Sequence, residues 1–102
     1  MLMLDRKEGE ALTIGKLKLK VVKVEQHRVK LVMTFPDNSI QHCSLPIKGC
    51  AWEPEPDIRI HCVKKIRRQT VQLGFDVPRH IHILRDNAKQ RYPKIGEVVA
   101  CG

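Results

Sequence analysis

Alternation of apolar and polar residues constrains the fold of this chain more than any other feature. In the run LKLKVVKV, Leu17, Leu19 and Val21 are separated by Lys18 and Lys20. A period of two puts successive side chains on opposite faces, so it predicts a β-strand with one buried and one solvated face. The period recurs in the opening residues MLMLDRK and in HRVKLVMTF, DIRIHCVKKI, QTVQLGFDVP and HIHIL. The side chains predicted to be buried in the three longer of these runs are Val29, Leu31, Met33, Ile58, Ile60, Cys62, Val71, Leu73 and Phe75.

These runs predict an all-β protein with one short helix near its C-terminus. The run RDNAKQRY lacks the period of two and has a helical character, and Pro93 ends it because proline cannot continue a helix. We therefore expect a helix near residues 86–92. At 102 residues the chain forms one domain, or two small units that share a core. A chain of this size buries only about 60–65 per cent of its unfolded surface, so two such units would depend on each other.

The net charge of the chain is +8, from 19 basic and 11 acidic residues. This excess favours an anionic partner, with nucleic acid first. No apolar run approaches the ~18 residues that cross a membrane, and the start lacks the basic-then-apolar layout of a signal peptide, so we expect a cytoplasmic protein. The sequence holds no recognisable trio of nucleophile, base and orienting group and no glycine-rich phosphate loop. We therefore expect neither an enzyme nor a bound cofactor.

The chain holds four cysteines, Cys43, Cys50, Cys62 and Cys101. In a reducing compartment they are expected to be thiols. His42 and His61 each precede one of them, which makes a metal site conceivable. However, no C-x-x-C or H-x-x-x-H spacing supports zinc, so we predict small buried side chains in strands and no metal.

A pattern of elements occurs twice along the chain. Residues 16–41 and 57–82 each contain a strand, a polar loop, a second strand, an apolar–proline pair and a short third strand. Few residues are identical between the copies, so the repeat is predicted from the alternation of apolar and polar residues and from the positions of the loops and prolines. Between the copies, SLPIKGCAWEPEPD has three prolines and one glycine and predicts a linker in which Trp52 is a packing anchor. The predicted organisation is a first half over 1–43, a linker over 44–56, a second half over 57–92 and a tail over 93–102.

The opening run MLMLDRKEGEALTIG resembles the start of the carbon storage regulator family (CsrA/RsmA), small bacterial proteins that bind messenger RNA. The family pattern Met-Leu-x-Leu-x-Arg-(Arg/Lys)-x-Gly-Glu-x-(Leu/Ile)-x-Ile-Gly is matched without a gap. The matching positions are Met1, Leu2, Leu4, Arg6, Lys7, Gly9, Glu10, Leu12, Ile14 and Gly15. The run DVPRHIHILRDNAKQR resembles the family's end motif, with matches at Gly74 just before it and at Val77, Pro78, Ile81, Ile83, Arg85 and Asp86. The two ends of the family pattern thus stand at the two ends of this chain, with extra sequence between.

The resemblance implies an interlocked dimer in which each first strand joins the sheet of the other subunit. It also implies an RNA site where the first strand of one subunit meets the last strand of the other. The implied target is a GGA-bearing single-stranded or hairpin loop in a messenger leader, where occupancy blocks translation, with small regulatory RNA as a further option. The implied RNA-binding residues are Leu4, Arg6, Lys7, Pro78, Ile81, His82, Ile83 and Arg85. An accessory basic face is expected from Lys18, Lys20, Lys64, Lys65, Arg67 and Arg68.

The two halves lack complementary pieces of that site. The second half has no copy of the first strand, and the first half has Ser44 where the terminal arginine would stand. One complete site can therefore be assembled within one chain from Leu4, Arg6 and Arg85, which predicts a single-chain pseudo-dimer with one working site. The alternative is that the later strands of the first half are an insertion and that the chain forms a homodimer with two sites.

Other interpretations of these residues stay open. Arg6 and Lys7 could be solvated charges that protect an edge strand from aggregation, and Arg85 could simply begin a helix. Asp5 and Gln72 replace the threonine and arginine common in the family, which predicts a weakened or retuned surface. Two classes of function are therefore compared, an RNA-binding translational regulator and a protein-interaction module. The second would use the same scaffold to modulate family members or a secretion or flagellar partner.

Overall fold

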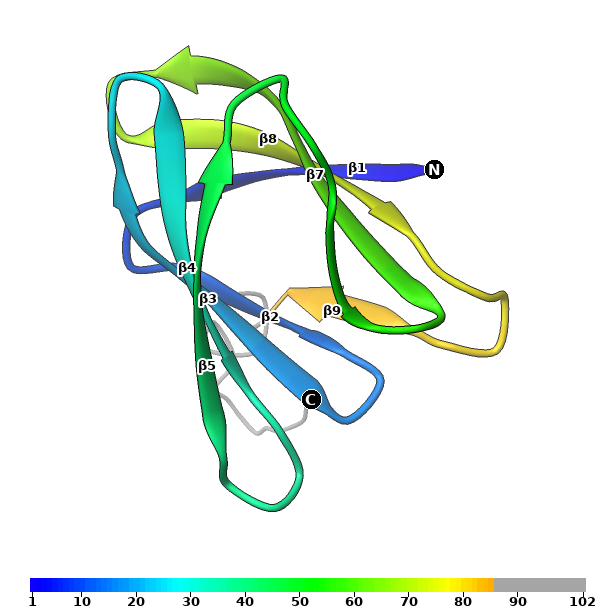
Figure 1. Ribbon diagram of the computed structural model, residues 1–102. Helices are drawn as coiled ribbons and strands as arrows, with labels where there is room; N and C mark the ends of the chain where they lie inside the picture. The colour runs from blue at the N-terminus through cyan, green and yellow to red at the C-terminus, as the bar shows by residue number, and fades with distance from the viewer. Residues whose placement is uncertain (86–102) are drawn as a thin grey trace, which may run out of the picture.

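The computed structural model describes residues 1–85, which form nine β-strands in two antiparallel sheets (Figure 1). Sheet A has the order β1-β8-β7-β6, and sheet B has the order β5-β4-β3-β2-β9. The strands of sheet A are β1 (Leu2–Lys7), β6 (Trp52–Glu55), β7 (Ile58–Arg67) and β8 (Thr70–Asp76). The strands of sheet B are β2 (Ala11–Ile14), β3 (Leu17–Val24), β4 (Arg28–Thr34), β5 (Ile40–Pro46) and β9 (Ile83–Arg85).

The inner faces of both sheets meet in one hydrophobic core. The apolar positions predicted from the period of two are all buried, and the lysines Lys18 and Lys20 between them are exposed. Each fully buried Leu, Val, Ile or Phe contributes about 1.5–3 kcal/mol of transfer free energy, so this face drives the two sheets together. Trp52 is half-buried against the same core, as expected of a packing anchor.

The central hairpins of the two sheets share a local irregularity. The β3–β4 ladder has a register shift between Val21 and Lys23, and the β7–β8 ladder has one between Cys62 and Lys64. In the predicted alignment of residues 16–41 with residues 57–82, these two shifts fall at matching positions. A β-bulge twists a hairpin and leaves one residue unpaired, so both sheets bend at corresponding points.

The chain crosses between the sheets at three places. Residues 8–10 lead from β1 in sheet A to β2 in sheet B, residues 47–51 lead back, and residues 77–82 lead to β9 in sheet B. At the second crossing, the Lys48 amide donates to the Cys62 carbonyl at 2.8 Å, and Ile47 forms a parallel bridge with Cys62. Consequently β1, from the first half of the chain, lies in sheet A with β6, β7 and β8. Likewise β9, from the second half, lies in sheet B with β2, β3, β4 and β5.

Three predictions about elements need correction. The fold class is all-β, but a helix was wrongly included: over residues 1–85 the chain has strands and turns alone, and the segment 86–92 lies outside the described residues. The proposed linker 44–56 is partly strand, because β5 continues to Pro46 opposite Arg28 and Trp52–Glu55 forms β6. The final strand is Ile83–Arg85 rather than 80–84.

Within the described part of the chain, no helix is long and apolar enough to cross a membrane.

Candidate nucleic-acid interface

The first and last described strands are exchanged between the sheets. β1 pairs with β8 at the edge of sheet A, with Leu4 opposite Leu73 and Arg6 opposite Val71. β9 pairs with β2 at the edge of sheet B, with Arg85 opposite Leu12. Figure 1 follows β1 from the N-terminus along sheet A and β9 beside β2. Within residues 1–85, each of the two motif-bearing strands therefore has one open edge.

The segment Glu8–Glu10 links the two sheets by main-chain hydrogen bonds. The Glu8 amide donates to the Gln69 carbonyl at 2.9 Å, in the turn after β7. The Gly9 amide donates to the Val21 carbonyl at 2.8 Å, and the Val21 amide donates to the Glu10 carbonyl at 3.0 Å. Gly9 has φ of +88°, a conformation that costs glycine little and other residues more. Main-chain hydrogen bonds to the β7–β8 turn and to β3 thus fix the segment that crosses between the sheets.

Arg6 lies inside the protein and not on its surface. It is only 4% exposed, and it extends from β1 on the same face as buried Leu4. Its Nε donates to the Asp5 carbonyl at 2.7 Å, and its Nη1 donates to the Ala11 carbonyl at 3.3 Å. The Glu10 carboxylate lies 3.8 Å from Nε. The Arg6 guanidinium therefore ties the end of β1 to the start of β2.

We define the β1–β9 corner by Lys7, Ala11, Leu12 and Arg85, which are connected through the segment Glu8–Glu10 and the β2–β9 ladder. Lys7 ends β1 and is exposed, and its amide donates to Glu10 Oε1 at 2.8 Å. Ala11, whose carbonyl accepts from Arg6, is next in sequence to Leu12, the register partner of Arg85. Arg85 is exposed. The corner thus presents two solvated cations beside two open strand edges.

The predicted site residues before Arg85 form a loop against sheet B. The Ile81 amide donates to the Pro78 carbonyl at 3.1 Å, and the His82 carbonyl accepts from the Gly15 amide at 2.8 Å. Gly15 has φ of +60°, and a Cβ there would lie 3.4 Å from the Ile81 side chain. Ile81 and Ile83 are half-buried against the core, and His82 is exposed. This loop anchors β9 to the β2–β3 turn.

The expected accessory basic face divides into two groups. Lys18 and Lys20 project from the outer face of sheet B, because Leu17 and Leu19 occupy the inner face. Lys64, Arg67 and Arg68 are exposed on β7 and in the turn that follows it. Lys65, from the same segment, donates through Nζ to the Glu25 carbonyl at 3.3 Å and so joins β7 to the β3–β4 turn. The six residues therefore belong to two sheets.

The two departures from the family pattern are neighbours in space. Asp5 on β1 is the register partner of Gln72 on β8. Asp5 is exposed and Gln72 half-buried. A carboxylate here repels phosphate, and glutamine supplies no compensating charge, so both changes lower the positive potential of the same ladder.

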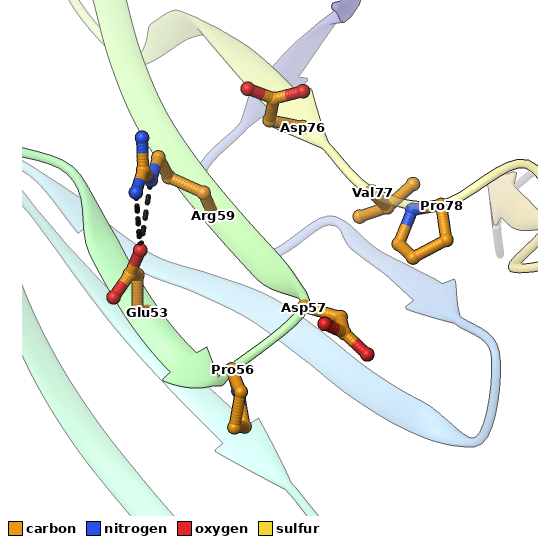
Figure 2. A pocket seen from close by; sticks show the side chains of 7 residues that line it. All are labelled: Glu53, Pro56, Asp57, Arg59, Asp76, Val77 and Pro78. Carbon is orange, nitrogen blue, oxygen red and sulfur yellow. Dashed lines mark hydrogen bonds and ion pairs between the residues drawn. The ribbon is translucent and has the colours of Figure 1, made fainter.

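A hollow, drawn in Figure 2, is lined by residues of β6, β7 and β8 and is rich in carboxylates. We call it the acidic hollow and define it by its lining residues Glu53, Pro56, Asp57, Arg59, Asp76, Val77 and Pro78. Both Arg59 Nε and Nη2 donate to Glu53 Oε2, at 2.9 and 2.6 Å, and this ion pair raises the pKa of Arg59. Pro78, expected at the RNA site, lies on the wall of this hollow.

The cysteines in the described residues are thiols in different environments. Cys62 is buried in β7, and desolvation raises its pKa to about 11. Burial also raises the pKa of Cys43, whereas Cys50 is exposed. Among residues 1–85, no group of three or more histidines, cysteines or carboxylates is placed to hold a metal ion.

The inward orientation of Arg6 and the role of Ala11 did not enter the sequence analysis. A signal for the first was present, because a period of two over MLMLDRK places Leu2, Leu4 and Arg6 on one face. No signal pointed to Ala11, since its contribution is a main-chain carbonyl that any residue type supplies.

Comparison with protein-family models matches residues 1–40 to CsrA, the global regulator protein family. The matched residues contain β1 to β4 and end at the first residue of β5, so they include the first-strand half of the β1–β9 corner and exclude Arg85. That family consists of RNA-binding regulators and not of enzymes, and the match supports a CsrA-like regulator. No curated protein and no solved structure matches the chain.

Proposed function

We propose that this protein is a post-transcriptional regulator that binds GGA-containing single-stranded or hairpin-loop sites in messenger leaders and represses their translation. The observation that carries the proposal is the exchange of the end strands, with β1 in sheet A and β9 in sheet B. This exchange matches the interlocked arrangement implied by the sequence resemblance, and residues 1–40 match the family model.

The β1–β9 corner supplies the groups that an RNA loop needs. The open edge of β1 offers main-chain amides and carbonyls to splayed bases, whose edges are free for hydrogen bonding. Arg85 offers a planar fork that can pair with guanine or phosphate, and Lys7 adds a phosphate contact. In this proposal buried Arg6 supports the corner from within, and Leu4 fixes the strand that presents it.

We further propose that the chain is an internally repeated pseudo-dimer, with one working site per chain. The matching register shifts in β3–β4 and β7–β8 and the equivalent buried positions of the two hairpins support the repeat. The strand orders support the single site. In sheet B, β5 pairs with β4 at one edge and β9 pairs with β2 at the other. In sheet A, β1 pairs with β8 at the edge equivalent to that of β5, but no described strand pairs with β6 in the position equivalent to that of β9.

The test is a titration of a labelled GGA hairpin and of the same hairpin with GGA changed to CCA, each at two salt concentrations. A regulator of this type prefers the GGA hairpin by about 1–3 kcal/mol for each discriminated base, and its affinity falls as salt rises. Equal binding of both hairpins and of a random strand would reject the proposal. It would leave the protein-interaction module as the function to pursue.

A further inference from the structure

Sheet B carries an unusual distribution of charge. None of its five described strands contains an aspartate or glutamate. Sheet A contains Asp5, Glu53, Glu55 and Asp76 in its strands. The basic residues in the strands of sheet B are Lys18, Lys20, Lys23, Arg28, Lys30 and Arg85.

Three of these lysines share the solvated face of the sheet. Lys18, Lys20 and Lys30 alternate with buried residues on β3 and β4, so their side chains project outward. Lys18 and Lys20 are two residues apart on one strand, which separates them by about 6.6 Å. Lys30 lies 3.7 Å from the Glu25 carboxylate in the β3–β4 turn, an exposed pair that contributes little. The face therefore keeps a positive potential.

A hollow opens on the same side, among β3, β4 and β5. It has a volume of about 460 Å³ and is lined by Val22, Lys30, Leu31, Val32, His42, Cys43 and Ser44. The register shift after Val21 leaves Val22 outside the ladder, where it is 48% exposed. Val32 and His42 are cross-strand partners on the outer face. The hollow thus combines aliphatic walls, an imidazole and the Lys30 cation.

We propose that the outer face of sheet B binds the single-stranded RNA that flanks the corner site. An unpaired base enters the hollow against Val22, Val32 and His42, while Lys18, Lys20 and Lys30 contact phosphates. Proteins that bind single strands combine a cationic surface with side chains against which bases pack, and this face has both.

The outer face meets the β1–β9 corner at the β9 edge of sheet B, where Arg85, the register partner of buried Leu12, extends from the other face of the sheet. β9, which carries Arg85, is the edge strand of sheet B, and only β2 separates it from β3, which carries Lys18 and Lys20. An RNA chain that leaves the corner round the β9 edge and crosses β2 reaches these lysines first and the hollow next. The inference rests on the proposed function to the extent that both surfaces serve one RNA molecule.

The experiment compares two RNAs with three forms of the full chain. One RNA is the bare GGA hairpin, and the other carries a tail of about ten unpaired uridines, within the site sizes of single-strand-binding folds. The proteins are the wild type, a triple variant with Lys18→Gln, Lys20→Gln and Lys30→Gln, and a control with Lys64→Gln, Arg67→Gln and Arg68→Gln. The control removes the same charge from β7 and its turn. Thermal melts establish that both variants are folded.

The triple variant in sheet B should bind the tailed RNA at least about 10-fold more weakly than wild type at 0.1 M salt. Its salt slope should fall by about 2, since each single-strand phosphate contact contributes about 0.7. Affinity for the bare hairpin should be much less affected, and the control should lose less for the tailed RNA. In the wild type, amide NMR shifts at Val22, Val32 and His42 should respond to the tail alone, which tests the hollow even if the variant unfolds.

Two outcomes separate this proposal from the proposed function. If the tail neither strengthens binding nor shifts the hollow's amides, the outer-face site is rejected while GGA preference can still hold. If the amides shift with uridine tails but GGA and CCA hairpins bind equally, the corner proposal fails and the face remains an RNA site. An acidic peptide titrated in the same NMR measurement provides a further outcome: if the amides of the hollow shift with the peptide and not with RNA, the face is a protein-docking surface and this inference is wrong.

Discussion

The β1–β9 corner and the acidic hollow, which is lined by residues of β6, β7 and β8, differ in charge. The corner has two exposed cations, Lys7 and Arg85, beside open strand edges. The hollow has Glu53, Asp57 and Asp76 around Arg59, whose guanidinium is already paired with Glu53. The corner can attract a polyanion, whereas the hollow repels one.

The strand orders give this difference a structural meaning. β5, the strand beside β4, is IQHCSLP and has no lysine or arginine, whereas β1, beside β8, ends in Arg6 and Lys7. β6 carries Glu53 and Glu55, and Pro54 removes one main-chain donor from this edge strand. In the proposed pseudo-dimer, the repeated scaffold keeps both sheets packed, and the β1–β9 corner alone among the described residues binds the GGA loop.

The largest expected effect comes from removing the buried support of the corner. Arg6→Ala deletes two hydrogen bonds to main-chain carbonyls and leaves a cavity, so we expect a loss of about 2–4 kcal/mol in the free energy of unfolding. Lys7→Ala, an exposed change on the same strand, should cost less than about 0.5 kcal/mol. Urea denaturation measures both. Equal stability of the two variants would contradict a supporting role for Arg6.

The next effect separates binding from folding at the corner. Arg85 is exposed, so Arg85→Ala should leave the melting temperature nearly unchanged. Loss of its fork should weaken GGA hairpin binding by about 10-fold or more. The matched control is Arg79→Ala, which removes the same charge from the exposed loop before β9 and should change affinity much less. Similar losses in both variants would mean that only net charge matters.

A smaller effect tests whether the two hairpins are equivalent inside the core. Cys62 in β7 occupies the position that Val21 occupies in β3, and both are buried. Cys62→Val should therefore change the free energy of unfolding by less than about 1.5 kcal/mol. The wild-type thiol, whose pKa is about 11, should react with iodoacetamide at pH 8 far more slowly than exposed Cys50. Rapid native labelling of Cys62, mapped by peptide mass, would contradict this core position.

The smallest effect is expected at the acidic hollow. Arg59→Ala breaks the exposed Glu53 pair and should leave the melting temperature nearly unchanged. It removes the same charge as Arg85→Ala, yet we expect GGA hairpin affinity to fall less than 3-fold. A loss comparable to that of Arg85→Ala, measured in the same titration, would place RNA at both the corner and the acidic hollow and remove the contrast between them.

The strands were predictable because buried positions repeat every two residues, and the side chains Val29, Leu31 and Met33 fulfil that pattern. The segment 44–56 was misjudged because proline and glycine usually end strands. Here Pro46 ends β5 opposite Arg28, and Pro54 lies on an edge strand, where a missing amide costs little. The accessory basic residues could be chosen by charge, but their division between sheets depends on register, which composition does not contain.

The most direct test of the account is the mass of the protein in solution, free and saturated with the GGA hairpin, measured by light scattering or native mass spectrometry. If one chain supplies both β1 and β9 to its own corner, the free protein has the mass of one chain and the complex contains one chain and one RNA. A free dimer that binds two RNA molecules would contradict the account.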